Sequence, residues 1–173
     1  LDHYLKGAPD PRIPAALTYE TGRNRWNASS QWPAGRPTPL YLTANDGLGF
    51  VAPSAGGHDD YVSDPAKPVP FVPRPVHSHD PDVWKPWLVH DQRFASGRPD
   101  VLEYETAPLD KPLHIMGAPQ VDLYAATSGS DSDWVVKLID VYPDDNGYAP
   151  EMSGYELAVG IEIFRGRYVD GFD

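Results

Sequence analysis

The longest run of strand-like apolar positions lies within residues 128–143, and the expectations for the other segments follow from it. A polar turn of Ser, Gly and Asp leads into W-V-V-K-L-I-D-V-Y, where side chains at period two fall on opposite faces. Only Lys137 and Asp140 interrupt the run, so we expect a central strand of a sandwich with both faces covered. Asn146-Gly147 then favours a type I′ hairpin turn, in which both residues need positive φ.

Shorter alternating segments predict further strands around this run. Residues 155–164 follow it and place an apolar face at every second position, from Leu157 to Ile163. The strands expected before it cover residues 15–21, 39–43, 48–52, 100–106, 113–116 and 120–127. The intervening residues 25–33 are expected to form a loop that carries Trp26 and Trp32.

Two segments depart from the strand pattern. Residues 1–7 resemble the end of a helix, with Lys6 near the negative end of the helix dipole and Gly7 at the left-handed C′ position. So short a helix is unstable alone, so we expect it to be the tail of a longer element. Residues 53–82 are rich in proline, which predicts an extended strap without ladder pairing, followed by a helical turn that carries Trp84 and Trp87.

Composition agrees with a β protein. Among 173 residues, 20 are proline and 15 are glycine, far more than helices tolerate. This length suits one domain with a real core. Many short strands separated by turns predict an all-β fold, a jelly-roll β-sandwich.

Charge and motifs exclude several classes of function. The formal net charge of −11 argues against partners such as nucleic acid or anionic membranes, and no apolar run is long enough to span a membrane. The sequence contains no cysteine, no G-x-S-x-G elbow, no phosphate-binding glycine loop and no H-E-x-x-H helix. These residues therefore hold no recognisable serine triad, and we expect no cofactor.

Two clusters raise the question of metal binding. His77 and His79 share a face in an extended chain, but zinc sites need three or four ligands, so a solvated loop is the favoured interpretation. Four acidic side chains are candidates for calcium from two loops, although they lack the EF-hand spacing and suit turns and caps equally well. These are Asp131, Asp133, Asp144 and Asp145.

Trp84 is the candidate for substrate binding. Large aromatic side chains commonly pack in cores, but Trp84 follows a proline-rich loop, and loops carry binding residues more often than cores do. Trp84 is thus either a core residue or part of an apolar pocket or a sugar platform.

Several motifs together resemble a known family. They are Y-V-S-D-P-A-K-P-V-P (61–70), L-V-H-D-Q-R-F-A-S-G-R-P-D-V-L (88–102), D-S-D-W-V-V-K-L-I-D-V-Y-P (131–143), G-Y-E-L (154–157) and R-G-R-Y (165–168). In this order they resemble the C-terminal part of the α-amino-acid ester hydrolases, which are β-lactam antibiotic acylases. Cocaine esterase and the X-Pro dipeptidyl-peptidases belong to the same superfamily.

The resemblance implies a secreted or periplasmic serine hydrolase whose Ser, His and Asp triad lies outside this chain. Residues 1–12 would end its α/β-hydrolase domain, residues 13–98 would form a linker, early strands and the strap, and residues 99–173 would form jelly-roll strands. Further strands follow the R-G-R-Y motif in relatives, so we expect this sandwich to be incomplete. No catalytic residue carries over to this chain. Trp84 matches a tryptophan that lines the acyl pocket, and Trp87 is expected at the domain interface.

The resemblance also implies partners: the upstream hydrolase and cap domains, an ester or β-lactam substrate, and a homo-oligomer of the full-length enzyme. The expected reaction is hydrolysis or transfer of an acyl group through an acyl-enzyme. Two alternatives stay open. One is a peptidase or cocaine-esterase-like hydrolase of the same superfamily, and the other is a free-standing jelly-roll module that binds carbohydrate.

Overall fold

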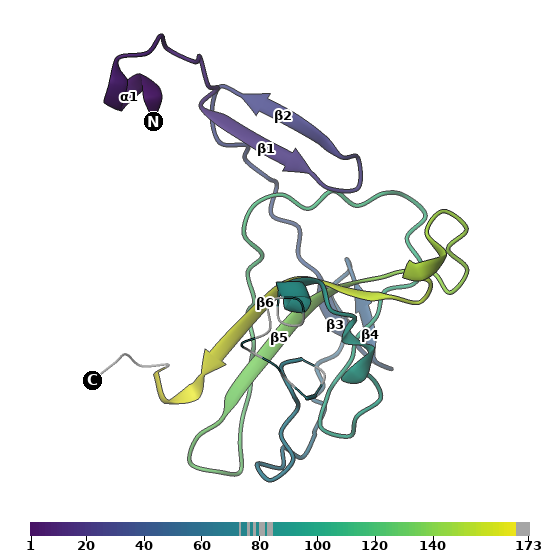
Figure 1. Ribbon diagram of the computed structural model, residues 1–173. Helices are drawn as coiled ribbons and strands as arrows, with labels where there is room; N and C mark the ends of the chain where they lie inside the picture. Colours follow the sequence, from purple (N-terminus) through teal and green to yellow (C-terminus); the bar gives the residue numbers. More distant parts are fainter. Residues whose placement is uncertain (73, 76, 78, 80–81, 83–84, 169–173) are drawn as a thin grey trace. The chain divides into compact units, whose positions relative to one another are not determined.

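The computed structural model describes residues 1–72, 74–75, 77, 79, 82 and 85–168, and within them strands far outnumber α-helical turns (Figure 1). The α-helix α1 (Asp2–Lys6) opens the chain, and Gly7 ends it at φ 66°, as the sequence predicted. The strands are β1 (Ala16–Glu20), β2 (Arg25–Ser29), β3 (Tyr41–Thr43), β4 (Gly47–Gly49), β5 (Asp133–Val141) and β6 (Glu156–Arg165). The 3₁₀ turns are η1 (Lys85–Val89), η2 (Gln92–Phe94), η3 (Pro150–Met152) and η4 (Gly166–Tyr168).

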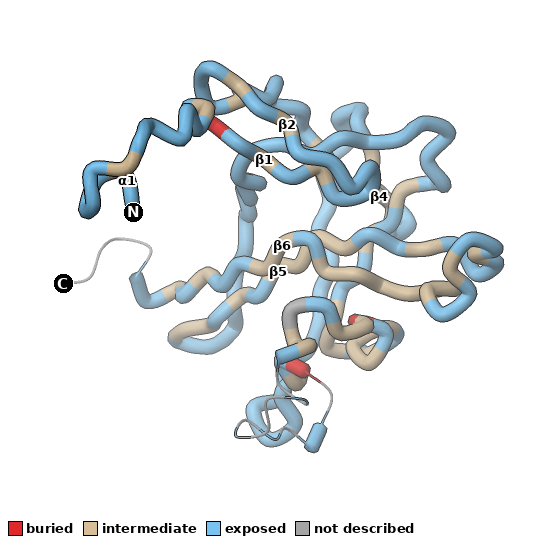
Figure 2. The backbone as a smooth tube through the Cα atoms, turned by 45° about the horizontal axis from the view of Figure 1, so that its top comes forward, coloured by how far each residue is buried: buried red, intermediate tan, exposed pale blue. Residues whose placement is uncertain are grey.

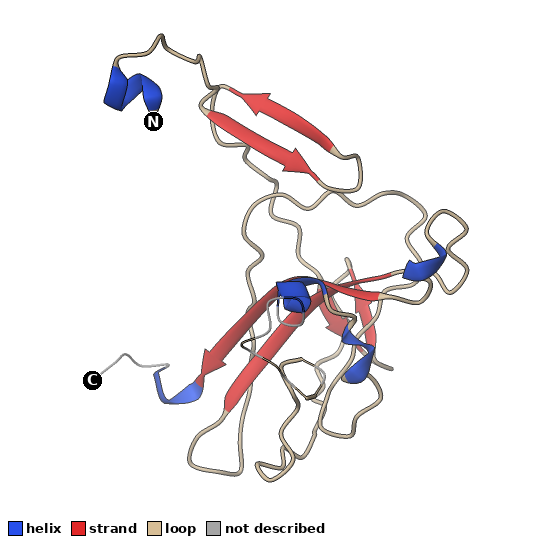
Figure 3. Ribbon diagram, in the orientation of Figure 1, coloured by secondary structure: helices blue, strands red, loops and turns tan. Residues whose placement is uncertain are grey.

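The chain divides into two compact units. The first contains residues 1–39 and 108–118, and the second contains residues 40–107 and 119–173. In the described residues, the six strands form three antiparallel pairs, β1 with β2, β3 with β4, and β5 with β6 (Figure 3). The fold is therefore all-β, as predicted, and its sheets are small and unclosed.

The β5–β6 hairpin is the longest sheet element and confirms the strands predicted at residues 128–143 and 155–164. Its register runs from Asp133 opposite Arg165 to Val141 opposite Glu156, with a shift between Leu138 and Ile139. Val159 has no partner in that register, so a β-bulge interrupts the apolar alternation expected for β6. β5 pairs with β6 alone among the described strands, so it is not a central strand there. Val135 on β5 is 54% exposed, so the expectation that both faces are covered is also wrong within the described residues.

The connection between β5 and β6 also differs from the sequence prediction. Asn146 does not have positive φ, so Asn146-Gly147 does not form a type I′ turn. Instead the Asn146 carboxamide accepts hydrogen bonds from the N–H groups of Tyr148 and Ala149, at 3.3 and 3.1 Å. The asparagine shapes the loop through its side chain, a common alternative to positive φ.

In the first unit, β1 and β2 form a hairpin, which corrects the loop predicted at residues 25–33. The two strands are joined by a turn in which the Asn24 N–H donates to the Thr21 carbonyl, with Asn24 at φ 50°. Tyr19 then lies opposite Trp26, and their rings meet edge to face at 5.1 Å. This exposed aromatic pair comes from adjacent strands and not from a loop.

Three predicted strands do not form ladders. Residues 113–116 and 120–127 have no strand pairing, and residues 100–106 contribute only one bridge, in which Glu105 meets Gly47. Two backbone hydrogen bonds hold that bridge, from the Leu48 N–H to the Glu105 carbonyl and from the Glu105 N–H to the Asp46 carbonyl. Apolar alternation is present in these segments, but a strand also requires a neighbouring backbone.

Few side chains are buried in the described residues (Figure 2). Ala16, Val72 and Gln92 are the buried ones, and the last of these is polar. The chain exposes 14716 Å² of surface, whereas a folded monomer of its 19.1 kDa exposes about 8,400 Å². The strands therefore leave apolar faces uncovered within the described residues.

Candidate functional site

The segment of residues 85–96 lies against the β5–β6 hairpin and joins it through several polar side chains of the second unit. It consists of η1 and η2, and both turns contact β6 (Figure 3). In η1 the Trp87 ring lies 5.2 Å from the Phe71 ring, centroid to centroid. The helical turn predicted to carry Trp87 is thus present as a 3₁₀ turn.

Asp91 fastens this segment to β6. Its backbone forms an antiparallel bridge with Leu157, and its Oδ1 accepts from the Glu156 N–H at 3.3 Å and the Arg93 N–H at 3.1 Å. Its Oδ2 accepts from Arg93 Nε at 2.6 Å. Burial by itself raises the pKa of Asp91, but these hydrogen bonds outweigh burial and hold the pKa below its usual range. The carboxylate therefore stays ionised as a cap and an anchor.

Gln92 forms a second attachment, this time to β5. Its side chain is 2% exposed, its Nε2 donates to the His90 carbonyl at 2.7 Å, and its Oε1 accepts from Lys137 Nζ at 2.6 Å. Lys137 Nζ also lies 5.2 Å from the centroid of the Phe94 ring, within range of a cation–π contact. Burial lowers the pKa of Lys137.

Two more hydrogen bonds complete the attachment. The Ser96 hydroxyl donates to Glu156 Oε2 at 2.7 Å, and the Tyr155 hydroxyl donates to the Val89 carbonyl. Together with Asp91 and Gln92, these contacts hold both ends of residues 89–96 on the hairpin. We call this set of contacts the Gln92 clip.

The metal sites considered from the sequence do not form in the described residues. No group of three or more His, Asp or Glu side chains there is arranged to hold a metal ion. His77, His79 and Asp82 are described, whereas Asp80 lies outside the described residues. The structure thus assembles no site from the part of this cluster that it describes.

The acidic residues proposed for calcium serve other contacts. Asp131 pairs with Arg167 at 2.7 Å and Asp133 pairs with Arg165 at 2.9 Å, across the end of the β5–β6 hairpin. The hydrogen bond from Arg167 holds the pKa of Asp131 below its usual range. Asp144 lies on the loop between β5 and β6, close to Gly154. These carboxylates are partners of arginine or loop residues and not a shared cation site.

The candidate Trp84 lies outside the described residues, so its placement stays a prediction. The other tryptophans fall into two groups. Trp26 and Trp32 are exposed, at 64% and 69%, whereas Trp87, against Phe71, and Trp134, on β5, are half-buried. The location of Trp87 at a domain interface also stays a prediction.

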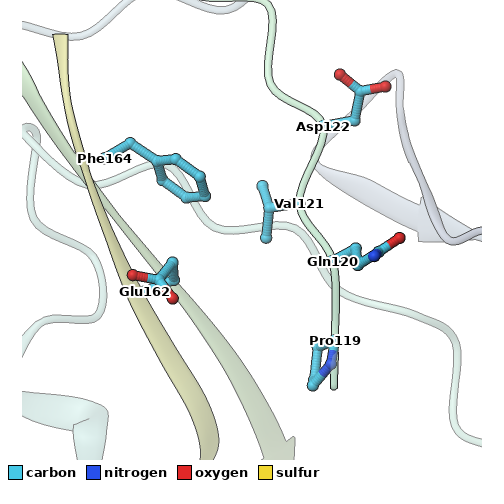
Figure 4. A pocket seen from close by; sticks show the side chains of 6 residues that line it. All are labelled: Pro119, Gln120, Val121, Asp122, Glu162 and Phe164. Carbon is cyan, nitrogen blue, oxygen red and sulfur yellow. The ribbon is translucent and has the colours of Figure 1, made fainter. Parts of the chain in front are cut away.

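An open hollow of about 530 Å³ lies between β6 and residues 119–122 (Figure 4). Phe164 and Val121 point toward each other across it, and Pro119, Gln120, Asp122 and Glu162 complete its lining. The Glu162 carboxylate accepts from the neighbouring Ile163 N–H at 2.9 Å. Asp122 and Glu162 are its only ionisable lining residues, and the lining contains no serine, histidine or lysine beside them.

Sequence reasoning did not identify the Gln92 clip. Two signals were present: Lys137 interrupts an apolar strand, and Gln92 lies within the H-D-Q-R part of a family motif. Neither signal indicates the partner, because the two residues are 45 positions apart in the sequence.

In the part of the chain that the structure describes, no helix has the length and apolar character needed to cross a membrane.

A family model describes residues 10–168 as the X-Pro dipeptidyl-peptidase C-terminal non-catalytic domain. Among curated proteins, the chain is 31% identical over 161 residues to cocaine esterase of a Rhodococcus species, covering 86% of this chain and 27% of that protein. It is also 30% identical over 155 residues to a putative serine esterase of Mycobacterium bovis, covering 83% of this chain and 23% of that protein.

Two solved structures are similar over 99% of this chain. One is an α-amino acid ester hydrolase, with 54% identity and a TM-score of 0.90, of which this chain covers 30%. The other is an aminopeptidase from a marine sediment archaeon of the Thaumarchaeota, with 47% identity and a TM-score of 0.91, of which it covers 28%. The chain therefore spans less than a third of the length of each of these relatives.

Proposed function

The chain belongs to the family of the X-Pro dipeptidyl-peptidase C-terminal non-catalytic domain, and from this membership we propose that it is the jelly-roll part of a serine ester hydrolase. The observation that carries the proposal is the match to an α-amino acid ester hydrolase, at 54% identity over 99% of the chain. This identity exceeds the 31% found with cocaine esterase, so α-amino acid esters are the favoured substrates.

In the proposed reaction, a serine outside residues 1–173 attacks the acyl carbonyl of an α-amino acid ester or of a β-lactam antibiotic. The alcohol or amine leaves with a proton from the catalytic histidine, and an acyl-enzyme remains. Water or a second amine then takes the acyl group and regenerates the serine. No cofactor takes part, and residues 1–173 contribute structure and one wall of the acyl pocket.

Residues 1–12 would complete an α/β-hydrolase domain, residues 13–98 would link it to the sandwich, and residues 99–173 would supply jelly-roll strands. The uncovered apolar faces of the described strands support partners of this kind, because such faces mark interaction surfaces. The hydrolase and cap domains of the same polypeptide are the proposed partners. The enzyme is proposed to act in the periplasm or outside the cell, as a homo-oligomer.

A direct comparison of two polypeptides tests the assignment of catalysis. The full-length enzyme should release alcohol from an α-amino acid ester in a burst followed by steady turnover, whereas residues 1–173 alone should show neither. Burst kinetics from residues 1–173 alone would contradict the proposal.

Trp84 is proposed to line the pocket for the acyl side chain. In the full-length enzyme, Trp84→Ala should lower kcat/KM for phenylalanine methyl ester more than for alanine methyl ester, because the larger side chain loses more apolar contact. Loss of a hydrophobic contact of this size changes the ratio of the two kcat/KM values by roughly tenfold. Trp87→Ala is a comparison variant. An unchanged ratio of the two kcat/KM values in Trp84→Ala would remove Trp84 from the pocket.

The nearest rival assignment is a peptidase, favoured by the 47% identity to an archaeal aminopeptidase. Profiling of the full-length enzyme separates the two, since a peptidase would cleave X-Pro or aminoacyl amides faster than the matching esters. Cocaine-esterase-like activity would show instead as a preference for benzoyl esters without an α-amino group.

A carbohydrate-binding module is the second candidate function, favoured by the exposed aromatic face of the β1–β2 hairpin. Tyr19 is 46% exposed and Trp26 is 64% exposed, and such rings are able to stack on sugars. A glycan-array signal lost in Trp26→Ala or in Trp84→Ala would support this function. No binding to any glycan would reject it.

A further inference from the structure

Gln92 is a buried amide whose orientation is fixed at both ends. Its Nε2 donates to the His90 carbonyl at 2.7 Å, and its Oε1 accepts from Lys137 Nζ at 2.6 Å. Exchange of the amide nitrogen and oxygen would place two donors, or two acceptors, against each other. The side chain therefore has one arrangement only, and that arrangement depends on Lys137.

Lys137 is an unusual partner for this amide because it carries a charge. Within the described residues it forms no ion pair, and its contacts are the neutral Gln92 amide and the face of Phe94. An apolar side chain of the same length would avoid the cost of desolvating an ammonium group. The lysine instead fixes the orientation of the Gln92 amide, since a charged donor forms a stronger and more specific hydrogen bond than a neutral one.

The fixed orientation of the Gln92 side chain matters for the residues that precede it in the sequence. η1 ends three residues before Gln92, and Trp84 directly precedes the first residue of η1. The Asp91 and Tyr155 contacts attach residues 89–91 to β6 and its adjoining loop, and the Lys137 contact attaches the next residue to β5. Two strands of the hairpin thus fix the end of η1.

We propose that Lys137 and Gln92 are positioning residues that fix residues 85–96 on the β5–β6 hairpin and thereby set the specificity of the acyl pocket. The proposal rests on the proposed function of Trp84 as one wall of that pocket. A displacement of about 1 Å in a group that positions substrate is able to change rates by up to 100-fold. The Lys137–Gln92 hydrogen bond would thus act on selectivity from a distance.

The test is the ratio of kcat/KM for phenylalanine methyl ester to kcat/KM for alanine methyl ester, measured in the full-length enzyme. Lys137→Met keeps the length of the side chain and removes the donor, and we expect it to lower this ratio by roughly tenfold. Lys137→Arg, which still donates to Gln92 Oε1, should restore part of the ratio. Lys111→Met, at an exposed lysine, is the matched control and should leave the ratio unchanged.

The ratio separates positioning from stability. A variant that merely folds less well loses the same fraction of active sites for both esters, so its ratio stays that of the wild type. An unchanged ratio in Lys137→Met, beside a changed ratio in Trp84→Ala, overturns the positioning role alone. An unchanged ratio in both variants overturns the pocket-wall role of Trp84 and the positioning role together.

A second variant covers the case in which Lys137→Met does not fold. Lys137→Met combined with Gln92→Met replaces both partners by apolar side chains of similar length, a change that is often neutral for stability. We expect the same roughly tenfold loss of selectivity and faster hydrogen exchange in residues 85–96. Wild-type selectivity in this double variant would overturn the proposal.

Discussion

Tyr104 shows how a single side chain ties the proline-rich region to a distant segment of the same unit. Its hydroxyl donates to Asp59 Oδ2 at 2.6 Å, across 45 positions of sequence. Burial, and after it the Asp59 carboxylate, raise the pKa of Tyr104 to about 12. The neutral phenol is the form that the folded chain prefers, because a phenolate would face a carboxylate at close range.

The Tyr104 pKa gives a prediction for alkaline pH. The unfolded pKa is near 10 and the folded pKa is higher, so this contact stabilises the fold fully below pH 10 and loses its effect as the pH rises toward 12. Phenolate absorbance at 295 nm should show one late-titrating tyrosine, absent in Tyr104→Phe. Asp59→Asn should lower the pKa of Tyr104. A late titration that survives in Tyr104→Phe would contradict this assignment.

At the scale of the element, the β5–β6 hairpin is the part of the fold that local sequence determines best. Its nine- and ten-residue strands pair through nearly their whole length. Two ion pairs and a close approach at Gly166 end the ladder. A Cβ at Gly166 would lie 2.8 Å from the Ser132 carbonyl oxygen and 3.0 Å from Trp134 Cζ3.

Gly166→Ala is therefore expected to destabilise the hairpin. Overpacking against a backbone oxygen and a tryptophan ring costs about 1–3 kcal/mol in the free energy of unfolding. Gly147→Ala, in the loop of the same hairpin, is the matched control because no atom lies within 4 Å of its added Cβ. Urea denaturation of the full-length protein would measure both variants. Equal midpoints for the two would show that the Gly166 contact relaxes without cost.

The sequence predicted β1, β3, β4, β5 and β6 from apolar alternation, but it did not predict β2. Arg25–Ser29 contains only one large apolar side chain, so its pairing with β1 depends on the turn at Asn24 and not on its own pattern. The opposite error occurred at residues 113–116 and 120–127, where alternation is present without a paired neighbour. Pairing is a property of two segments, which a one-dimensional pattern does not contain.

At the scale of the whole molecule, the exposed apolar side chains of the described residues bear most directly on stability. Val135 on β5 and Ile163 on β6 lie opposite each other and are 54% and 47% exposed. A domain of this length usually buries about 70% of the surface of its unfolded chain. Stability therefore depends on contacts beyond those within the described residues.

A polypeptide of residues 1–173 alone should consequently unfold with low cooperativity. Because the m-value scales with the surface exposed on unfolding, it should lie well below the 1–3 kcal/mol/M, roughly, that small globular proteins show in urea. Strong binding of a hydrophobic dye before any denaturant is added is expected as well. A sharp two-state transition with a normal m-value would show that these residues form a closed core unaided.

The family could be predicted from motifs, whereas the contacts of the candidate site could not. Lys137 and Gln92 were visible as a polar interruption and a motif residue, but their hydrogen bond joins a strand to a 3₁₀ turn far away in the sequence. The arginine partners of Asp131 and Asp133 were hidden for the same reason, since they lie on the other strand or beyond its end.

The location of the nucleophile tests the central claim most directly. The full-length enzyme should be labelled with a fluorophosphonate, digested, and mapped by mass spectrometry. We predict a single modified serine that lies outside residues 1–173, with labelling prevented by prior incubation with an α-amino acid ester. A modified serine within residues 1–173 would contradict the account.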